Sequence, residues 1–367
     1  MFQPPLPSEY LDLSEDELSS RITAAKQRLG DRVVILGHHY QRDETIRHSD
    51  YRGDSYKLAK DGAALPNAEY IIFCGVHFMA ESADILAAEH QKVILPNLSA
   101  GCSMADMASI IQVRACWKAL EDLGVAESMV PVTYINSAAN LKAFVGQHGG
   151  AVCTSSNCPK VLAWALGQGD KILFFPDQHL GRNTALAMGY DESQMVVWDP
   201  ITTEPYGGNT REALAAAKFI LWKGHCSVHG RFNVKQIEYA RSRFPDVKVI
   251  VHPECRREVV EAADDYGSTE RIQTVIRNSP PGSKWAVGTE INLVSRLAEE
   301  EKANNKLIFC LDPIVCPCST MYRIAPPNLL WVLDNLEAGK VVNEIKVPDQ
   351  IAADARLALA RMIEIAG

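Results

Sequence analysis

Apolar and polar positions follow two different periods along most of the chain. From Arg32 onward, short apolar runs rich in β-branched and aromatic residues are separated by longer stretches in which apolar residues recur at helical spacing. This alternation is typical of βαβ units, in which helices connect parallel strands. The pattern therefore predicts an α/β fold with parallel sheets.

Helices are expected on both sides of this region. Ser14 and Glu17 form a capping-box pattern, which predicts an amphipathic helix that extends to about Leu29. Apolar residues on one face predict a helix over 327–337, and a final helix is expected over 352–365. We expect these last two helices to pack back on the body of the protein.

Nearly every apolar run ends in a cluster of polar residues. In chain order these clusters are Gly37-His38-His39-Tyr40, Cys74-Gly75-Val76-His77, Pro96-Asn97-Leu98-Ser99-Ala100-Gly101-Cys102, Tyr134-Ile135-Asn136-Ser137, Thr154-Ser155-Ser156-Asn157, Pro176-Asp177-Gln178-His179-Leu180-Gly181, Lys223-Gly224-His225-Cys226, His252-Pro253-Glu254-Cys255 and Gly288-Thr289-Glu290. Taken three at a time, they recur at a spacing of roughly 90 residues, which predicts a triplicated unit. The expected fold is three similar small α/β/α domains with parallel sheets.

The repeat predicts four segments of chain. The N-terminal helix and the first α/β domain would occupy residues 1–126, the second domain 127–214, the third 215–325, and the C-terminal helices 326–367. Parallel α/β sheets bind ligands beyond the carboxyl ends of their strands, where the loops face helix N-termini. The polar run ends could therefore converge on one shared site. Alternatively, three independent units use them only as helix caps.

Composition and charge indicate what kind of molecule the protein binds. The chain has 367 residues, 47% of them hydrophobic, and its 37 basic and 45 acidic groups give a formal charge of −8. This length and apolar content exclude the disordered, collagen-like and miniprotein classes. Lys and Arg form no long run, so we expect a small-molecule partner rather than nucleic acid or an anionic membrane. The sequence shows no export signal and no apolar stretch of membrane-spanning length, which predicts a cytoplasmic protein with reduced cysteines.

Cysteines at strand-to-helix junctions are candidate metal ligands, because a helix N-terminus lowers the pKa of a thiol. Cys102, Cys226 and Cys318 fit this description, and Cys316 stands two residues before Cys318. The chain has no Cys-x-x-Cys pair, so a zinc ribbon or an ordinary four-cysteine ferredoxin pattern finds no support. Three scattered thiolates would leave one metal position open, as a Lewis-acid catalyst requires. The remaining cysteines are expected to be buried structural thiols: Cys74, Cys116, Cys153, Cys158, Cys255 and Cys310.

Histidines and one glutamate also gather at the predicted strand ends. In an extended segment Glu254 and His252 would face the same way, so Glu254 is a candidate general acid or base. A salt bridge from Glu254 to Arg256 or Arg257 is the alternative. The other histidines are His38, His39, His225 and His229. Groups suited to carboxylate or phosphate oxygens, each of them more often a cap than a ligand, are Tyr40, Tyr134, Asn136, Ser55, Ser155, Ser156 and Thr269.

Many of these clusters form an ordered set of motifs between residues 30 and 340. The motifs are Gly37–Gln41, Gly53–Ser55, Cys74–Glu81, Gly101–Asp106, Tyr134–Ser137, Thr154–Asn157, Pro176–Gly181, Gly224–His229, His252–Cys255, Gly288–Glu290 and Cys318–Met321. In content and order they resemble the quinolinate synthase family, which acts in de novo pyridine nucleotide (NAD) biosynthesis.

The resemblance implies three similar α/β domains around a pseudo-threefold axis, with the active site at their common interface. It also implies a [4Fe–4S] cluster held by one cysteine from each domain, at Cys102, Cys226 and Cys318. Cys318 keeps the family's spacing to Met321, whereas the family's proline follows Cys316, so Cys316 is the alternative third ligand. The iron that lacks a cysteine would serve as a Lewis acid.

The family is a transferase that condenses iminoaspartate (iminosuccinate) with dihydroxyacetone phosphate to quinolinate, with loss of phosphate and two waters. The resemblance implies catalytic roles for Glu254, Tyr40, His38 and His252. It implies that the substrates are bound by His38, Ser55, Tyr134, Ile135, Asn136, Ser155, His252, Pro253, Glu254 and Thr269. An L-aspartate oxidase is the implied supplier of iminoaspartate. The rival functions are a zinc-dependent hydrolase that uses the same groups and a non-catalytic iron–sulfur sensor.

Overall fold

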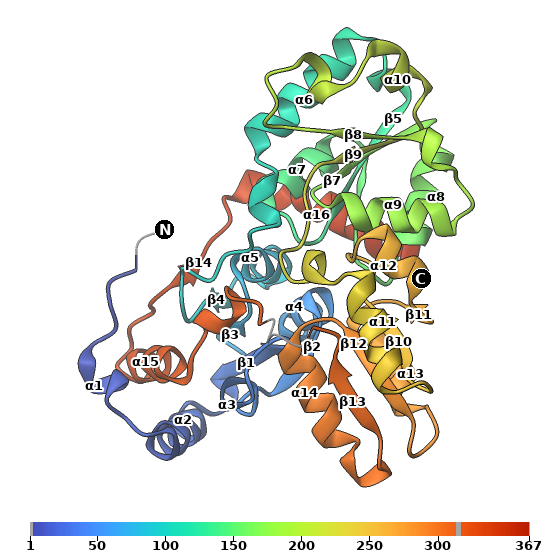
Figure 1. Cartoon of the computed structure of the whole chain (residues 1–367). Coiled ribbons are helices and arrows are strands. Elements are labelled where there is room, and N and C mark those ends of the chain that lie inside the picture. Colours follow the sequence, from blue (N-terminus) through green and yellow to red (C-terminus); the bar gives the residue numbers. More distant parts are fainter. Residues whose placement is uncertain (1–2, 313–316, 367) are drawn as a thin grey trace. The chain divides into compact units, whose positions relative to one another are not determined.

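Helices and strands alternate along the chain and build three sheets (Figure 1). The computed structural model describes residues 3–312 and 317–366. These residues form two compact units, one made of 3–102, 290–296 and 317–348 and the other of 103–289, 297–312 and 349–366. The predicted α/β class with parallel sheets is confirmed in both units.

The first unit holds one sheet, in the strand order β14-β4-β3-β1-β2. Its strands are β1 (Val33–His38), β2 (Tyr51–Gly53), β3 (Tyr70–Cys74), β4 (Lys92–Ile94) and β14 (Glu344–Ile345). All neighbours pair in parallel except β14, which joins β4 antiparallel at the edge. The helices of this unit are α1 (Ser8–Leu11), α2 (Glu15–Leu29), α3 (Asp43–Ile46), α4 (Ser55–Ala63), α5 (His77–Leu86), α15 (Pro326–Glu337) and the first part of α14 (Ile291–Glu300).

The second unit holds two all-parallel sheets, in the orders β6-β5-β7-β9-β8 and β11-β10-β12-β13. The strands are β5 (Met129–Tyr134), β6 (Ala151–Cys153), β7 (Lys171–Phe175), β8 (Met195–Trp198), β9 (Phe219–Trp222), β10 (Lys248–Val251), β11 (Asp265–Tyr266), β12 (Lys284–Gly288) and β13 (Leu307–Cys310). The helices are α6 (Ile110–Asp122), α7 (Ala139–Gln147), α8 (Cys158–Gln168), α9 (Gln178–Ala187), α10 (Arg211–Ala216), α11 (Val234–Arg243), α12 (Arg257–Ala262), α13 (Thr269–Arg277), α16 (Asp349–Ala366) and the second part of α14.

Four strands of each sheet follow one common order. This order is β2-β1-β3-β4 in the first sheet, β6-β5-β7-β9 in the second and β11-β10-β12-β13 in the third. A shared order is what a triplicated unit produces, so the predicted repeat is present. One expectation was wrong: the run before Lys223 was grouped with the third set, but this strand, β9, pairs with β7 in the second sheet. The domain limits near residues 126, 214 and 325 and the pseudo-threefold arrangement stay predictions.

The helices expected at both ends of the chain are confirmed. Ser14 Oγ accepts the N–H of Glu17 at 3.4 Å, and the Glu17 carboxylate accepts the N–H of Ser14 at 2.9 Å, so the capping box starts α2. The predicted C-terminal helices are α15, which packs on α2, and α16, which packs on α7.

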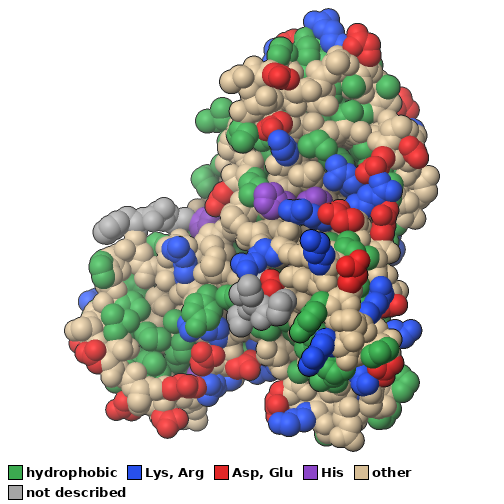
Figure 2. All heavy atoms as spheres, viewed as in Figure 1, with side chains coloured by type: hydrophobic (Ala, Val, Ile, Leu, Met, Phe, Trp, Pro, Cys, Tyr) green, Lys and Arg blue, Asp and Glu red, His purple; other side chains and the backbone are tan. Residues whose placement is uncertain are grey.

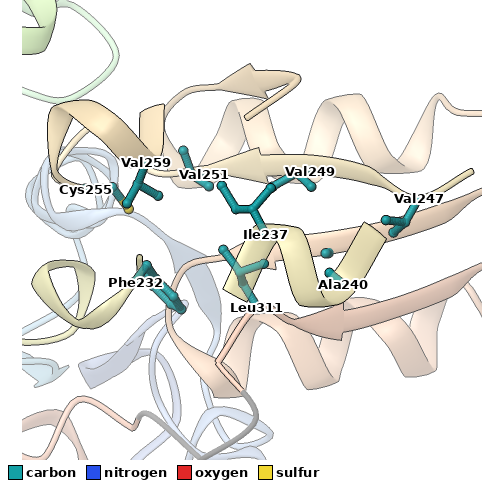
Figure 3. Close-up of a cluster of buried hydrophobic side chains, with 10 residues drawn as sticks. Phe232, Ile237, Ala240, Val247, Val249, Val251, Cys255, Val259 and Leu311 are labelled. Carbon is teal, nitrogen blue, oxygen red and sulfur yellow. The ribbon is translucent and has the colours of Figure 1, made fainter. Parts of the chain in front are cut away.

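The third sheet shows how the strands are held (Figure 3). Helix α11 places Ile237 and Ala240 against β10, whose Val249 and Val251 are fully buried. Burial of such side chains stabilises the fold by about 25 cal/mol per Å² of apolar surface removed from water. Strands buried on both faces read as continuous apolar runs, which is why their ends were visible in the sequence.

Charged side chains of both signs lie on the surface. On the face seen in Figure 2, basic and acidic side chains are interspersed rather than gathered into one large basic area. Within residues 3–312 and 317–366, no helix combines the length and the apolar character needed to cross a membrane.

Helix α16 lies so close to α7 that a methyl group has no room at Gly146. A Cβ there would stand 1.9 Å from the carbonyl oxygen of Asp354, a backbone atom that cannot rotate away. We expect Gly146→Ala to lower the free energy of unfolding by about 2 kcal/mol or more, the usual range for overpacking. Gly167→Ala in α8 is the matched control, because its Cβ meets nothing within 4 Å. Chemical denaturation of both variants checks this, and equal stability would contradict the packing.

Candidate functional site

Three cysteines follow the same strand of each repeat. Cys102 comes after β4, Cys226 after β9 and Cys318 after β13, the fourth strand in the common order. All three are half-buried, and among the described residues only Cys310 shares that exposure. The thiols of Cys74, Cys116, Cys153, Cys158 and Cys255 are buried, as expected of structural cysteines. The predicted ligands therefore occupy equivalent and accessible positions, whereas Cys316 lies outside the described residues.

In the second unit, Glu254 is the centre of a buried polar group. It follows β10, and its Oε2 lies 2.7 Å from Nδ1 of His229. Because a carboxylate only accepts hydrogen bonds, the His229 Nδ1 carries the proton in this contact. The other ring nitrogen, Nε2, lies 3.1 Å from the Thr289 hydroxyl. The ring of His252 stacks on that of His229, with centroids 4.3 Å apart.

The surroundings of Glu254 favour its ionised form. Burial alone would raise the pKa of Glu254, but the rings of His252 and His229 and hydrogen bonds from His229 and Tyr134 hold it well below its usual range. Burial and the neighbouring His229 lower the pKa of His252 to about 3, so that ring is neutral. A carboxylate beside a neutral imidazole and a phenol can accept a proton from a bound substrate. The predicted alternative, a salt bridge from Glu254 to Arg256 or Arg257, is not found among its contacts in the described chain.

Asp177 is a second buried carboxyl group near Glu254. Its Oδ1 accepts the N–H groups of His179 at 2.6 Å and Leu180 at 2.9 Å, so it caps α9. Burial and the negative charge of Glu254 raise the pKa of Asp177, although these N–H groups and that of Cys226 oppose the rise.

Three residues of this site were given no role from the sequence. His229 was noted among the strand-end histidines, Thr289 belongs to the Gly288–Glu290 motif, and Asp177 belongs to the polar cluster Pro176–Gly181. The available signal was the concentration of polar residues after each strand. Their mutual contacts join segments 25 to 60 residues apart, which no local pattern reports.

A metal ion could be held at one point of this site. Donor atoms of Cys226, His229 and Glu254 all lie within 4.8 Å of one another. Thiolate ligands suit iron and zinc, and imidazole and carboxylate groups complete many such sites. The half-buried cysteines at equivalent strand ends fit the thiolate set that an iron–sulfur cluster requires.

In the first unit, the predicted site residues surround the turn after β1. His38 Nδ1 accepts the N–H of Tyr40 at 3.1 Å, and the two rings meet edge to face at 4.9 Å. Burial and the charges of His39 and Arg296 lower the pKa of His38 to about 3. The ring therefore stays neutral and can offer a hydrogen bond to a ligand.

The loop of Cys318 is also in the first unit and is held by a buried acid. The N–H of Cys318 donates to Oε1 of Glu290 at 3.2 Å. Burial raises the pKa of Glu290 to about 7, against the effect of the N–H groups that face it. Burial likewise raises the pKa of the Cys318 thiol, while hydrogen bonds from Thr320 and Met321 oppose the rise.

The other predicted binding residues lie at element ends. Ser55 begins α4 and Thr269 begins α13. Tyr134 ends β5 and is followed by Ile135 and Asn136, Ser155 lies in the turn after β6, and Pro253 precedes Glu254. Within the second unit the structure brings together Tyr134, His252 and Glu254. Their roles, and those of the residues in the first unit, stay predictions.

Asn183 of α9 fixes the segment that holds Glu254. Its Nδ2 donates to the carbonyl oxygens of Pro253 at 2.9 Å and Cys255 at 2.8 Å, and it is buried. Asn183→Asp keeps the shape but removes the donor, so the free energy of unfolding should fall by about 1–3 kcal/mol. Urea denaturation checks this, with Asn335→Asp as control because Asn335 donates to a single carbonyl in its own helix. Wild-type stability in the Asn183 variant would refute the role.

A sequence model of the family described as quinolinate synthetase A protein matches residues 20–364 of this chain. The match spans both compact units and every predicted site residue.

Curated relatives named quinolinate synthase are similar over nearly the whole chain. The relative from Corynebacterium glutamicum is 57% identical over 360 residues, which cover 98% of this chain and 90% of the relative. The relative from Streptomyces coelicolor is 55% identical over 360 residues, covering 98% and 91%. A relative from a Geobacillus species is 53% identical over 362 residues, covering 98% and 97%.

Proposed function

Because this chain belongs to the quinolinate synthetase A family, an enzyme family of NAD biosynthesis, we propose that it condenses iminoaspartate with dihydroxyacetone phosphate to quinolinate. The family resemblance inferred from the motifs is thereby confirmed. Loss of one phosphate and two waters balances the reaction. The observation that carries the proposal is the similarity over 98% of the chain.

The proposed cofactor is a [4Fe–4S] cluster held by Cys102, Cys226 and Cys318. One half-buried cysteine after the fourth strand of each repeat supports this ligand set. When bound, the cluster supplies an open iron that acts as a Lewis acid on a substrate oxygen.

The chain's own residues divide into those that move protons and those that bind the substrates. Glu254 would take up and return protons on its carboxylate, oriented by His229 and Tyr134. Tyr40, His38 and His252 are the proposed partners in catalysis. The remaining proposed binding groups are Ser55, Tyr134, Ile135, Asn136, Ser155, Pro253 and Thr269. Iminoaspartate is unstable in water, so an L-aspartate oxidase that produces it in the same cytoplasm is the proposed supplier.

Anaerobic purification with iron and sulfide counts, followed by a quinolinate assay on the same sample, tests cofactor and reaction together. A brown protein that forms quinolinate is expected. Colour without product would favour the iron–sulfur sensor, and a colourless zinc protein would favour the hydrolase.

Cys226→Ala should abolish iron binding while leaving the fold intact, because each sheet has its own buried core. Cys310→Ser is the matched control, since Cys310 is equally half-buried but is the last residue of β13 and is not a proposed ligand. Iron counts and thermal melting of both variants check this. Full iron retention in the Cys226 variant would remove that cysteine from the ligand set.

Glu254→Gln should keep the cluster and lower kcat by at least about 100-fold, the usual contribution of a general acid or base. The amide preserves the shape of the side chain but cannot take up a proton. Glu258→Gln, which alters an exposed acid on the next helix, should leave kcat unchanged. Steady-state assays at matched iron content compare the two, and a wild-type rate for the Glu254 variant would contradict its role.

A further inference from the structure

Glu290 uses its two carboxylate oxygens for two different tasks. It lies two residues after the end of β12, immediately precedes α14 and is fully buried. Oε2 accepts the N–H groups of Asn292 at 2.8 Å and Leu293 at 3.3 Å, which is the contact of a helix cap. Oε1 accepts the N–H of Cys318 at 3.2 Å and the side-chain amide of Asn292 at 2.8 Å. A helix cap alone needs no second oxygen.

We propose that Glu290 is a positioning residue that anchors the loop of Cys318 in the geometry required for cluster binding. This inference rests on the proposed function, in which Cys318 is a cluster ligand. Groups that hold a metal ligand in place contribute about 10- to 100-fold to metal affinity or activity.

The anchor reaches the backbone of the cysteine rather than its sulfur. Cys318 lies in a tight turn in which its carbonyl oxygen accepts the N–H of Tyr322 at 3.0 Å. Its Sγ lies 3.4 Å from the Thr320 hydroxyl, and the carbonyl of Met321 accepts a bond from Gln41 at 3.3 Å. Contacts within the turn and the bond from Gln41 therefore hold the turn in place. The contact with Glu290 fixes Cys318 at the start of the turn.

The same carboxylate is connected to the turn of Tyr40. Asn292, which donates to Glu290 Oε1, also donates to the carbonyl oxygen of Tyr40 at 3.4 Å. One turn later, Arg296 donates to the carbonyl oxygens of His39 at 3.0 Å and Gln41 at 2.6 Å. The start of α14 thus holds a proposed ligand loop and a proposed substrate-binding turn together within the first unit.

The other repeats contain a related connection, which supports a role beyond capping. In the second repeat, Asp177 stands at the equivalent position after β7 and caps α9. There the N–H of Gln178 donates to the Gly224 carbonyl, two residues before Cys226, at 3.0 Å.

In the first repeat, Val76 stands at the capping position, and its side chain makes no capping hydrogen bond. The N–H of His77 donates to the Ala100 carbonyl, two residues before Cys102, at 2.8 Å. A connection between the helix after the third strand and the cysteine loop after the fourth therefore recurs in all three repeats.

A pair of variants separates the anchor from the cap. Serine is as good an N-cap as the acids, but its side chain is too short to reach Cys318. Glu290→Ser should therefore keep the cap and lose the anchor, whereas Glu290→Ala loses both. Glu290→Gln keeps the length and one acceptor oxygen, so it should restore part of the anchor. Asn233→Ala is the control, because Asn233 caps α11, in which no proposed ligand lies.

The measurement is the rate at which a chelator removes iron from the anaerobically reconstituted protein, together with thermal melting and the electron paramagnetic resonance spectrum of the reduced cluster. We expect iron loss to be about 10- to 100-fold faster in both the Ser and Ala variants, with an altered spectrum. The Gln variant should fall between them and wild type. The melting temperature should be lower in the Ala variant than in the Ser variant, because only the Ala variant loses the cap. Asn233→Ala should lose iron at the wild-type rate.

Either of two results would overturn the inference while leaving the proposed function intact. One is that Glu290→Ser loses iron no faster than loaded wild type. The other is that Asn233→Ala loses iron as fast as the Glu290 variants. A wild-type chain that takes up no iron would instead overturn the proposed function, and the inference with it.

Discussion

Buried carboxyl groups impose the strictest requirement on this structure. A carboxyl group removed from water is tolerated only where donors or charges face it. Glu254, Asp177 and Glu290 are each at most 2% exposed, and each lies at the end of a strand. Glu290 takes donors from the next helix and from the distant loop of Cys318, whereas Glu254 takes its donor from distant His229. Asp177 accepts the N–H groups of the helix that it caps. Glu254 and Glu290 therefore connect segments that no local interaction would hold together.

The position of these acids follows from the parallel sheets. Every parallel strand ends at the same edge as its neighbours, and the helix that follows begins there with unpaired N–H groups. An acid at this point meets several donors and a favourable helix dipole at once. Because a carboxylate has two oxygens, one can cap the helix while the other reaches the next strand's loop. Glu290 shows this division most clearly.

Much of the fold could be predicted because its determinants are local. The capping box of Ser14 and Glu17 and the buried runs of the strands depend on neighbouring residues, and both were placed correctly. The strand β9 was placed in the wrong group because a short apolar run contains no information about its partner. Its pairing with β7 joins residues nearly 50 positions apart. Pattern alone located the strand ends but not the sheets to which they belong.

The sequence indicated which residue types form the site but not which of these residues contact one another. Glu254 and His252 were visible as a pair because they are two residues apart, and the three cysteines because they follow strand ends. His229 and Thr289 gained a role only when the fold brought them to Glu254. Glu290 looked like part of a motif, and its second partner lies 28 residues away. Residues that touch substrates can be recognised by type, whereas residues that hold them in place are defined by contacts that only the folded chain creates.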